Sequence, residues 1–183
     1  MLAKYERILA LARPYLLRGS ALIHTLQALK FASKLLRNEG GDPDVVMPTV
    51  ILHDSGYSKV GVKWTQVDSG TKVPIHMFES ARIAERILKE TSFPVDKACE
   101  VIKIIQSHDV IPFPFHSIEA KVFKDADRLA GYFTPFGFSV IAKQKNVNEA
   151  LSKAEEMLSA FLTSSGLMIA IRQLKKLKKK YTT

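Results

Sequence analysis

Four histidines and two aspartates in this chain have the side-chain types that bind a metal ion: His24, His53, Asp54, His76, His108 and Asp127. The pair His53-Asp54 ends an apolar run that begins at Val50, and Gly56 lies two residues after the pair. Two polar side chains at the end of an apolar run pack poorly in a core but are well suited to coordinate a metal. Neutral imidazoles and carboxylates suit Mn²⁺, Fe²⁺, Co²⁺, Ni²⁺ and Zn²⁺, and Mg²⁺ is also compatible. We therefore expect the chain to bind one or two divalent cations.

A first group of four supplies ligands to one octahedral cation: His24, His53, Asp54 and Asp127. Such a cation keeps coordination positions for water and a substrate phosphate oxygen. One hypothesis for His76 and His108 is a second cation with Asp54 as the bridge, since paired cations clamp the attacking and leaving oxygens of a displacement at phosphorus. The alternative for His76 and His108 is direct contact with a substrate phosphate, without a second cation. A lone histidine on an apolar stripe, such as His24, is more often a core residue with a hydrogen-bond partner.

The composition limits the fold class and the compartment. A length of 183 residues fits one domain, 1–183, with a substantial core. No run of about 18 apolar residues occurs, so we expect no membrane span. The N-terminus carries charge at once and has no signal-peptide pattern, which favours the cytoplasm. The single cysteine, Cys99, excludes an internal disulfide and a thiolate metal cage.

The net charge of +9 favours an anionic partner. Much of the excess lies in the run Lys175 to Lys180, which is also typical of a solvated helix end. Nucleotides, other phosphate esters and nucleic acid are partners of this kind, and the basic run does not distinguish between them.

The hydrophobic pattern has a helical period and little alternation of period two, which predicts an all-α bundle. The expected helices cover residues 3–17, 20–38, 44–53, 74–90, 94–106, 117–129, 147–162 and 165–181. Pro14 should bend or break the first helix, whose apolar side is expected to hold Leu9, Leu11, Leu16 and Leu17. Residues 56–74 break the pattern, and an irregular stretch of this length is usually functional or mobile.

Capping residues predict where two of the ligand-bearing helices begin. Ser20 is the expected N-cap of the second helix, which places His24 on its buried stripe. Asp42, with Pro43 in the first turn, starts the third helix, and that helix ends at His53. Ser117 is expected to cap the helix that carries Asp127.

The order His24, His53-Asp54, Asp127 resembles the H…HD…D signature of the HD-domain metal-dependent phosphohydrolases. His76 and His108 resemble the additional ligands of the subset that assembles a second metal. The resemblance covers about residues 20–130, with the C-terminal helices at about 147–181 outside it.

Two segments around these residues carry the resemblance further. Residues 50–56 are similar to the apolar-HD-x-G segment of the family, and residues 119–129 are similar to its last ligand helix. In that helix Asp127 corresponds to the family ligand, and Asp125 is the alternative, as a residue that supports the ligands.

The resemblance implies an HD-type helical bundle that hydrolyses a phosphate ester or phosphoanhydride with metal-activated water. Side chains expected to assist the reaction are Asp54, Lys59, Lys63, Asp109 and Arg128. The basic ones are candidate phosphate contacts. Asp109, beside His108, is a candidate to orient a ligand or to accept a proton.

Two branches of the family have motifs from which this chain departs. Ser58-Lys59 stands near the position where the (p)ppGpp hydrolases have an acidic pair. The cyclic-dinucleotide phosphodiesterases have a Gly-Tyr-Pro motif and paired histidines, whereas Asp109 follows His108 here. We therefore expect neither (p)ppGpp nor a cyclic dinucleotide as the substrate.

The alternative function is a nucleic-acid-binding or regulatory protein that uses the same fold as a scaffold. Its contact surface would be the basic C-terminal helix. The ligand set favours the enzyme, because a scaffold has no need of six such side chains.

Overall fold

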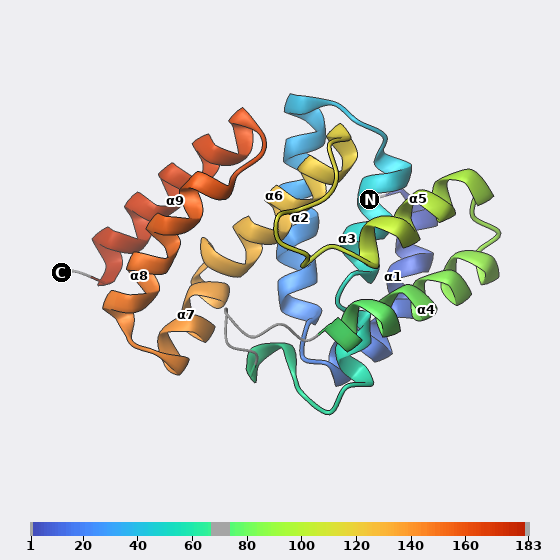
Figure 1. Cartoon of the computed structure of the whole chain (residues 1–183), viewed down its shortest axis with the longest axis horizontal. Coiled ribbons are helices and arrows are strands. Elements are labelled where there is room, and N and C mark those ends of the chain that lie inside the picture. Colours follow the sequence, from blue (N-terminus) through green and yellow to red (C-terminus); the bar gives the residue numbers. More distant parts are fainter. Residues whose placement is uncertain (1, 67–73, 182–183) are drawn as a thin grey trace.

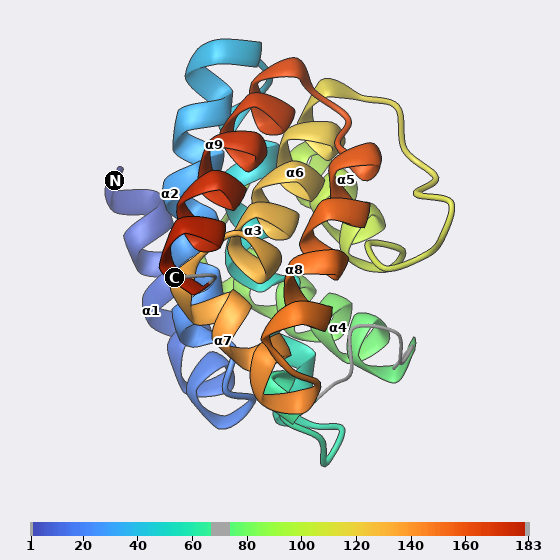
Figure 2. The same ribbon diagram turned by 90° about the vertical axis from the view of Figure 1, so that its left-hand side faces the viewer.

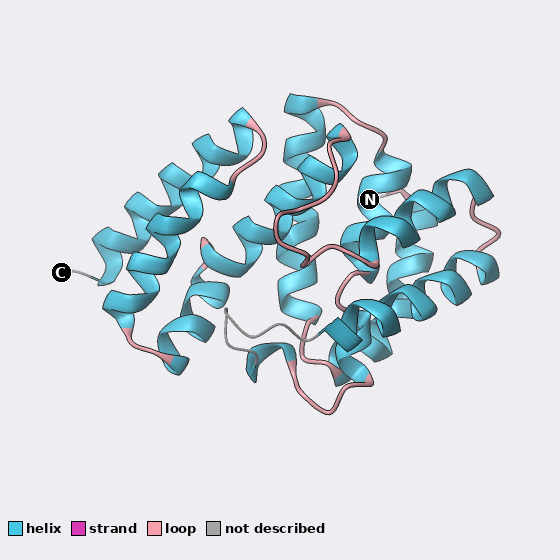
Figure 3. Ribbon diagram, in the orientation of Figure 1, coloured by secondary structure: helices cyan, strands magenta, loops and turns pink. Residues whose placement is uncertain are grey.

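The computed structural model describes residues 2–66 and 74–181, and within these ranges the chain forms helices and connections without a strand (Figure 3). The all-α prediction is confirmed. The α-helices are α1 (Ala3–Arg18), α2 (Leu22–Glu39), α3 (Pro43–Leu52), α4 (Pro74–Glu90), α5 (Val95–Ile105), α6 (Ile118–Tyr132), α7 (Pro135–Gln144), α8 (Val147–Glu156) and α9 (Ser164–Tyr181). Short 3₁₀ helices are η1 (Ser55–Ser58), η2 (Trp64–Gln66) and η3 (Met157–Ala160).

Helices α2 and α6 pack against each other at the centre of the bundle (Figure 1). On one side α3 packs on both of them and on α1 and α5, while α4 pairs with α5. On the other side lie α7, α8 and α9, and the view turned by 90° shows α9 in front of α6 (Figure 2). One hydrophobic core runs through the bundle from Tyr5 on α1 to Leu177 on α9.

Helix α3 is the most enclosed element, since its side chains from Val45 to Leu52 are all buried. A helix that is apolar all round belongs inside the core rather than at its surface. Asp42 is its N-cap and accepts a hydrogen bond from Asp44 N at 2.7 Å, as predicted, and Pro43 occupies the first turn. His53 and Asp54 follow the last turn directly, so the chain delivers both polar side chains into the interior.

Gly56 fixes how the chain leaves the His53-Asp54 pair. Its backbone N donates to Ser80 Oγ at 2.8 Å, which docks η1 on α4. A Cβ at this position would lie 2.6 Å from Ser80 N and would overlap the carbonyl oxygen of His76. Only glycine fits this close approach, which sets the distance between Asp54 and the first turn of α4.

The first helix differs from the prediction in two respects. It runs without a break through Pro14, which lies on the exposed side together with Ala10, so the carbonyl that proline leaves without a donor faces water. Leu17 was predicted on the apolar side, but it is exposed. The buried side is formed by Tyr5, Ile8, Ala12 and Leu16, which follow the helical period.

Two other predictions about elements were wrong. Ser20 is not the N-cap of α2, because it has φ of 60° and α2 begins after Ala21 without a side-chain cap. Helix α7 was missed, although Thr134 caps it by accepting from Gly137 N at 3.0 Å and Pro135 opens it.

The predicted irregular segment 56–74 contains η1 and η2, and its part 67–73 lies outside the described residues. Within the described ranges, every helix is too short or too polar to cross a membrane.

Replacing Gly56 with alanine should destabilise the protein strongly, because the added methyl group must push η1 away from α4. We expect the free energy of unfolding to fall by about 3 kcal/mol, the upper part of the usual range for one substitution. Urea unfolding would measure it. Gly131→Ala in α6 is the matched control, since its nearest neighbour would lie at an ordinary 3.9 Å. Equal stability of the Gly56→Ala and Gly131→Ala proteins would contradict this account.

Candidate metal centre

The structure brings all six predicted metal ligands into one cluster: His24, His53, Asp54, His76, His108 and Asp127. They come from α2, the end of α3, α4, the turn after α5, and α6. Each histidine is 1% exposed, whereas the Asp127 side chain is 16% exposed. Such burial of polar groups is costly unless they pair with one another or bind a metal.

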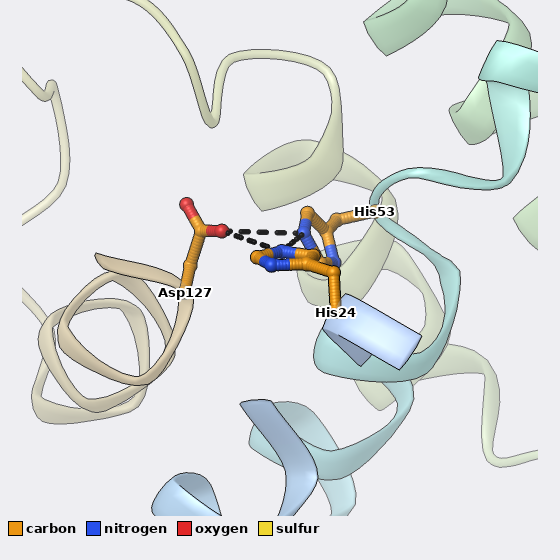
Figure 4. Close-up of side chains that lie close together, drawn as sticks. All are labelled: His24, His53 and Asp127. Carbon is orange, nitrogen blue, oxygen red and sulfur yellow. Dashed lines mark hydrogen bonds and ion pairs between the residues drawn. The ribbon is translucent and has the colours of Figure 1, made fainter. Parts of the chain in front are cut away.

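One group consists of two imidazole nitrogens and one carboxylate oxygen (Figure 4). His24 Nε2 lies 3.0 Å from Asp127 Oδ1 and 3.4 Å from His53 Nε2. His53 Nε2 lies 3.5 Å from the same Asp127 oxygen. The three donor atoms therefore converge on one point from three separate elements.

The second group lies on the other side of Asp54. His76 Nε2 and His108 Nε2 are 3.1 Å apart, and they lie 3.8 and 3.7 Å from Asp54 Oδ1. The other oxygen, Asp54 Oδ2, lies 3.5 Å from His24 Nε2 and 3.2 Å from His53 Nε2. The two oxygens of one carboxylate thus face two different groups of histidines.

Asp109 faces the second group as well. Its Oδ2 lies 3.5 Å from His76 Nε2 and 3.7 Å from His108 Nε2, similar to the distances from Asp54. Its side chain is 44% exposed, far more than that of any histidine in the cluster. Solvent therefore reaches the cluster on the side of Asp109.

Lys124 is a buried residue of the cluster that the sequence interpretation missed. Its Nζ donates to Asp127 Oδ2 at 2.9 Å and to Asp109 Oδ1 at 3.0 Å. Burial by itself lowers the pKa of Lys124, but the charges of Asp127 and Asp109 raise it above its ordinary value. The sequence signal was the i, i+3 spacing of Lys124 and Asp127, which places both on one helix face.

Asp125 and Arg128 lie on another face of α6, away from the ligands. The Asp125 carboxylate accepts from Thr163 N and Thr163 Oγ1, both at 2.8 Å, and so anchors the start of α9. Arg128 lies 3.6 Å from that carboxylate and donates to the carbonyl of Ala160. Successive helical residues are about 100° apart, so Arg128 does not share the direction of its neighbour Asp127.

Lys59 and Lys63 are exposed on the surface after η1. Within the described ranges, neither makes an ion pair with a residue of the cluster. His116 is exposed in the connection between α5 and α6.

Backbone carbonyls orient two of the imidazole rings. His53 Nδ1 lies 3.0 Å from Val50 O, and His108 Nδ1 lies 2.8 Å from Ile105 O. These contacts place the proton on Nδ1 and leave the lone pair of Nε2 directed at the cluster. This is the tautomer that a metal ligand requires.

The electrostatics keep the carboxylates ionised and favour a proton on His53. Burial alone raises the pKa of Asp54, but the charges and hydrogen bonds of His53 and His108 lower it well below its ordinary value. Burial likewise raises the pKa of Asp127, but its interactions with Lys124 and His24 lower it well below its ordinary value. For His53, burial lowers the pKa, and the Asp54 carboxylate raises it well above its ordinary value.

The donor set fits a divalent cation. In each group of three, the donor atoms lie within 4.8 Å of one another. Imidazole nitrogen and carboxylate oxygen suit the first-row divalent metals named above. A cation bound here would replace the additional proton that the raised pKa favours on His53.

Comparison with protein families finds that the model of the HD domain matches residues 21–132. The matched stretch runs from the start of α2 to the end of α6 and contains all six predicted ligands. Comparisons with curated proteins and with solved structures find no match.

Removing the Lys124 ammonium should destabilise the metal-free protein, because two carboxylates lose their shared counter-ion. In chelator, we expect Lys124→Met to lower the free energy of unfolding by about 3 kcal/mol. Mn²⁺ should restore most of the loss, since a cation would compensate the same carboxylates. Urea unfolding with and without Mn²⁺ measures both effects, with Lys121→Met on the same helix as the control. A Lys124→Met protein as stable as the control in chelator would contradict this role.

The cluster should also give the metal-free protein a stability maximum at weakly acidic pH. Stabilisation by Asp54 and Asp127 is present above their unfolded pKa of about 4 and is lost as the pH falls through their lower native values. Stabilisation by His53 is present below its unfolded pKa of about 6.5 and is lost as the pH rises through its higher native value. The melting temperature in chelator should therefore decline above about pH 6.5.

Thermal unfolding across this pH range measures the effect. His53→Gln should remove part of the alkaline decline, and His116→Gln should leave it unchanged. The same alkaline slope in the wild-type and His53→Gln proteins would show that His53 is not responsible.

Proposed function

The chain belongs to the HD-domain family, and on this basis we propose that it is a metal-dependent phosphohydrolase. Its proposed substrate is a phosphate ester or phosphoanhydride of a nucleotide or another small phosphorylated metabolite. The observation that carries the proposal is the position of Asp54, whose two oxygens face two separate groups of histidines. Carboxylates placed in this way bridge the cations of two-metal hydrolytic sites.

Two cations divide the ligands between them in this proposal. His24, His53 and Asp127 would hold one cation together with Asp54 Oδ2. His76 and His108 would hold the other together with Asp54 Oδ1. When bound, divalent cations activate water by Lewis acidity and neutralise charge on phosphoryl oxygens.

The charge of the cluster supports an anionic substrate. Asp54, Asp109 and Asp127 contribute three negative charges, and Lys124 contributes one positive charge. Two divalent cations would leave the filled site with a net charge of +2, which complements the dianion of a phosphate monoester. One cation would leave it neutral.

Exposure indicates the side from which a substrate would approach. The histidines are closed off by the core, while the side chains of Asp109, Asp127 and Lys124 retain contact with solvent. The Lys124 ammonium stays protonated through neutral pH because its pKa is raised. We assign it the role of neutralising negative charge on a bound phosphoryl group.

Asp109 is better suited to orient the Lys124 ammonium than to accept a proton. Burial raises its pKa, but His108 and Lys124 lower it below the ordinary value, and so weak a base takes up few protons at neutral pH. Its contact with Lys124 holds the ammonium between the two groups of ligands. Lys59 and Lys63 remain proposed contacts for more distant parts of the substrate. Arg128 has its partners elsewhere, at the Asp125 carboxylate on α6 and the carbonyl of Ala160 in η3.

The proposal is tested by metal content and phosphate release. Purified protein should bind up to two Mn²⁺ or Co²⁺ per chain and release phosphate from members of a panel of nucleotides and sugar phosphates. His53→Ala and Asp54→Asn should lower both metal content and turnover, the latter by about 100-fold or more. His116→Ala and Asp96→Asn exchange exposed residues of the same types and serve as controls.

Folded His53→Ala and Asp54→Asn proteins with full metal content and turnover would contradict the assignment of the site. Full metal content without phosphate release from any of these compounds would retain the metal site and reject the proposed reaction.

A further inference from the structure

Trp64, the single tryptophan of the chain, lies against one of the proposed ligands. Its indole stacks on the imidazole of His24 with ring centroids 4.4 Å apart and an interplanar angle of 24°. Trp64 opens η2, outside α2, so a residue distant in sequence covers a ligand in the first turn of that helix.

The ring of His24 lacks the backbone hydrogen bond that orients the rings of His53 and His108. The Nδ1 atoms of His53 and His108 each contact a backbone carbonyl. The Nδ1 atom of His24 is buried and has no hydrogen-bond partner in the described parts of the chain. A metal-binding histidine nearly always donates its second ring N–H, and this contact fixes the plane and tautomer of the ring. His24 lacks that restraint.

Rotamer preference does not supply the missing restraint. The torsion that turns a histidine ring about its Cβ–Cγ bond has a broad distribution, so the ring plane must be fixed by its neighbours. A parallel indole at stacking distance restricts this rotation, because turning the imidazole would drive its edge into the neighbouring ring. The stack therefore does for His24 what the carbonyls do for His53 and His108.

Trp64 is itself held by two other parts of the bundle. Its backbone N donates to Gly19 O, after α1, at 2.9 Å. Phe136 in the first turn of α7 stacks on it at 6.0 Å with an interplanar angle of 13°. Gln144 at the end of α7 donates to Thr65 O at 2.9 Å. Contacts at both ends of α7 thus fix η2 over the start of α2.

We propose that Trp64 is a positioning residue that orients His24 as a metal ligand by stacking, in place of a hydrogen bond to Nδ1. This inference rests on the proposed metal site and adds a residue to it. The indole does not coordinate the cation. It keeps the Nε2 lone pair of His24 directed at the point shared with His53 and Asp127.

Co²⁺ titration of chelator-treated protein, followed by calorimetry, tests the proposal. Trp64→Leu should weaken binding at the His24 site by about tenfold, in the range seen when residues that orient a ligand are lost. Trp64→Phe keeps an aromatic face and should retain most of the affinity. Phe161→Leu is the matched control, since it removes an aromatic contact with Phe133 instead of one with a candidate ligand. Circular dichroism establishes that each protein is folded.

The emission of Trp64 gives a second readout that needs no substitution of the indole. Co²⁺ bound to His24 would lie close to the stacked ring and should quench its fluorescence in the wild-type protein. In a His24→Gln protein the same Co²⁺ concentrations should cause much less quenching. This measurement tests whether the cation binds beside the stacked ring, as the proposal requires, even if Trp64→Leu does not fold.

Wild-type affinity in the Trp64→Leu protein, or bound Co²⁺ without quenching, would overturn the role of Trp64 and leave the proposed function intact. Equal losses in Trp64→Leu and Trp64→Phe would overturn stacking as its cause. A wild-type protein that binds no Co²⁺ would overturn the proposed metal site together with this inference.

Discussion

The arrangement of this bundle depends on one buried carboxylate, Asp54, whose two oxygens contact imidazoles on opposite sides. A buried carboxylate is costly unless charged or hydrogen-bonded groups surround it. Here the partners come from α2, the end of α3, α4 and the turn after α5, so four parts of the chain must meet at this residue. The enclosed helix α3 carries Asp54 to the centre, and Gly56 lets α4 approach closely enough for His76 to reach it.

A second connection closes the cluster on its solvent side. Asp127 and Asp109 each direct one oxygen at histidines and the other at the Lys124 ammonium. The two groups of ligands are therefore joined twice, through an anion at Asp54 and through a cation at Lys124. In the proposed reaction the two connections have different roles. Asp54 on the interior side would hold the cations, and Lys124 on the solvent side would receive the anionic substrate.

The sequence predicted the parts of this site that depend on residue type and order. The six candidate ligands could be selected by residue type and order, and the structure brings them together. The helical fold and the Asp42 cap could be inferred because each has a local signature. Lys124 could not, since a lysine three residues before an aspartate is common on exposed helices and only packing shows that this one is buried. Arg128 was placed beside the ligands because it follows Asp127, but the helical rotation turns it toward Asp125. The stacking of Trp64 on His24 depends on α7, a helix the pattern did not predict.

The central claim is that Asp54 bridges two divalent cations. Crystals grown with Mn²⁺, with diffraction measured at the manganese absorption edge, test it most directly. The account predicts two anomalous peaks about 3.5–4 Å apart, one beside each oxygen of Asp54. One peak would lie near His24, His53 and Asp127, and the other near His76 and His108. A single peak, or two peaks of which either is not in contact with Asp54, would contradict it.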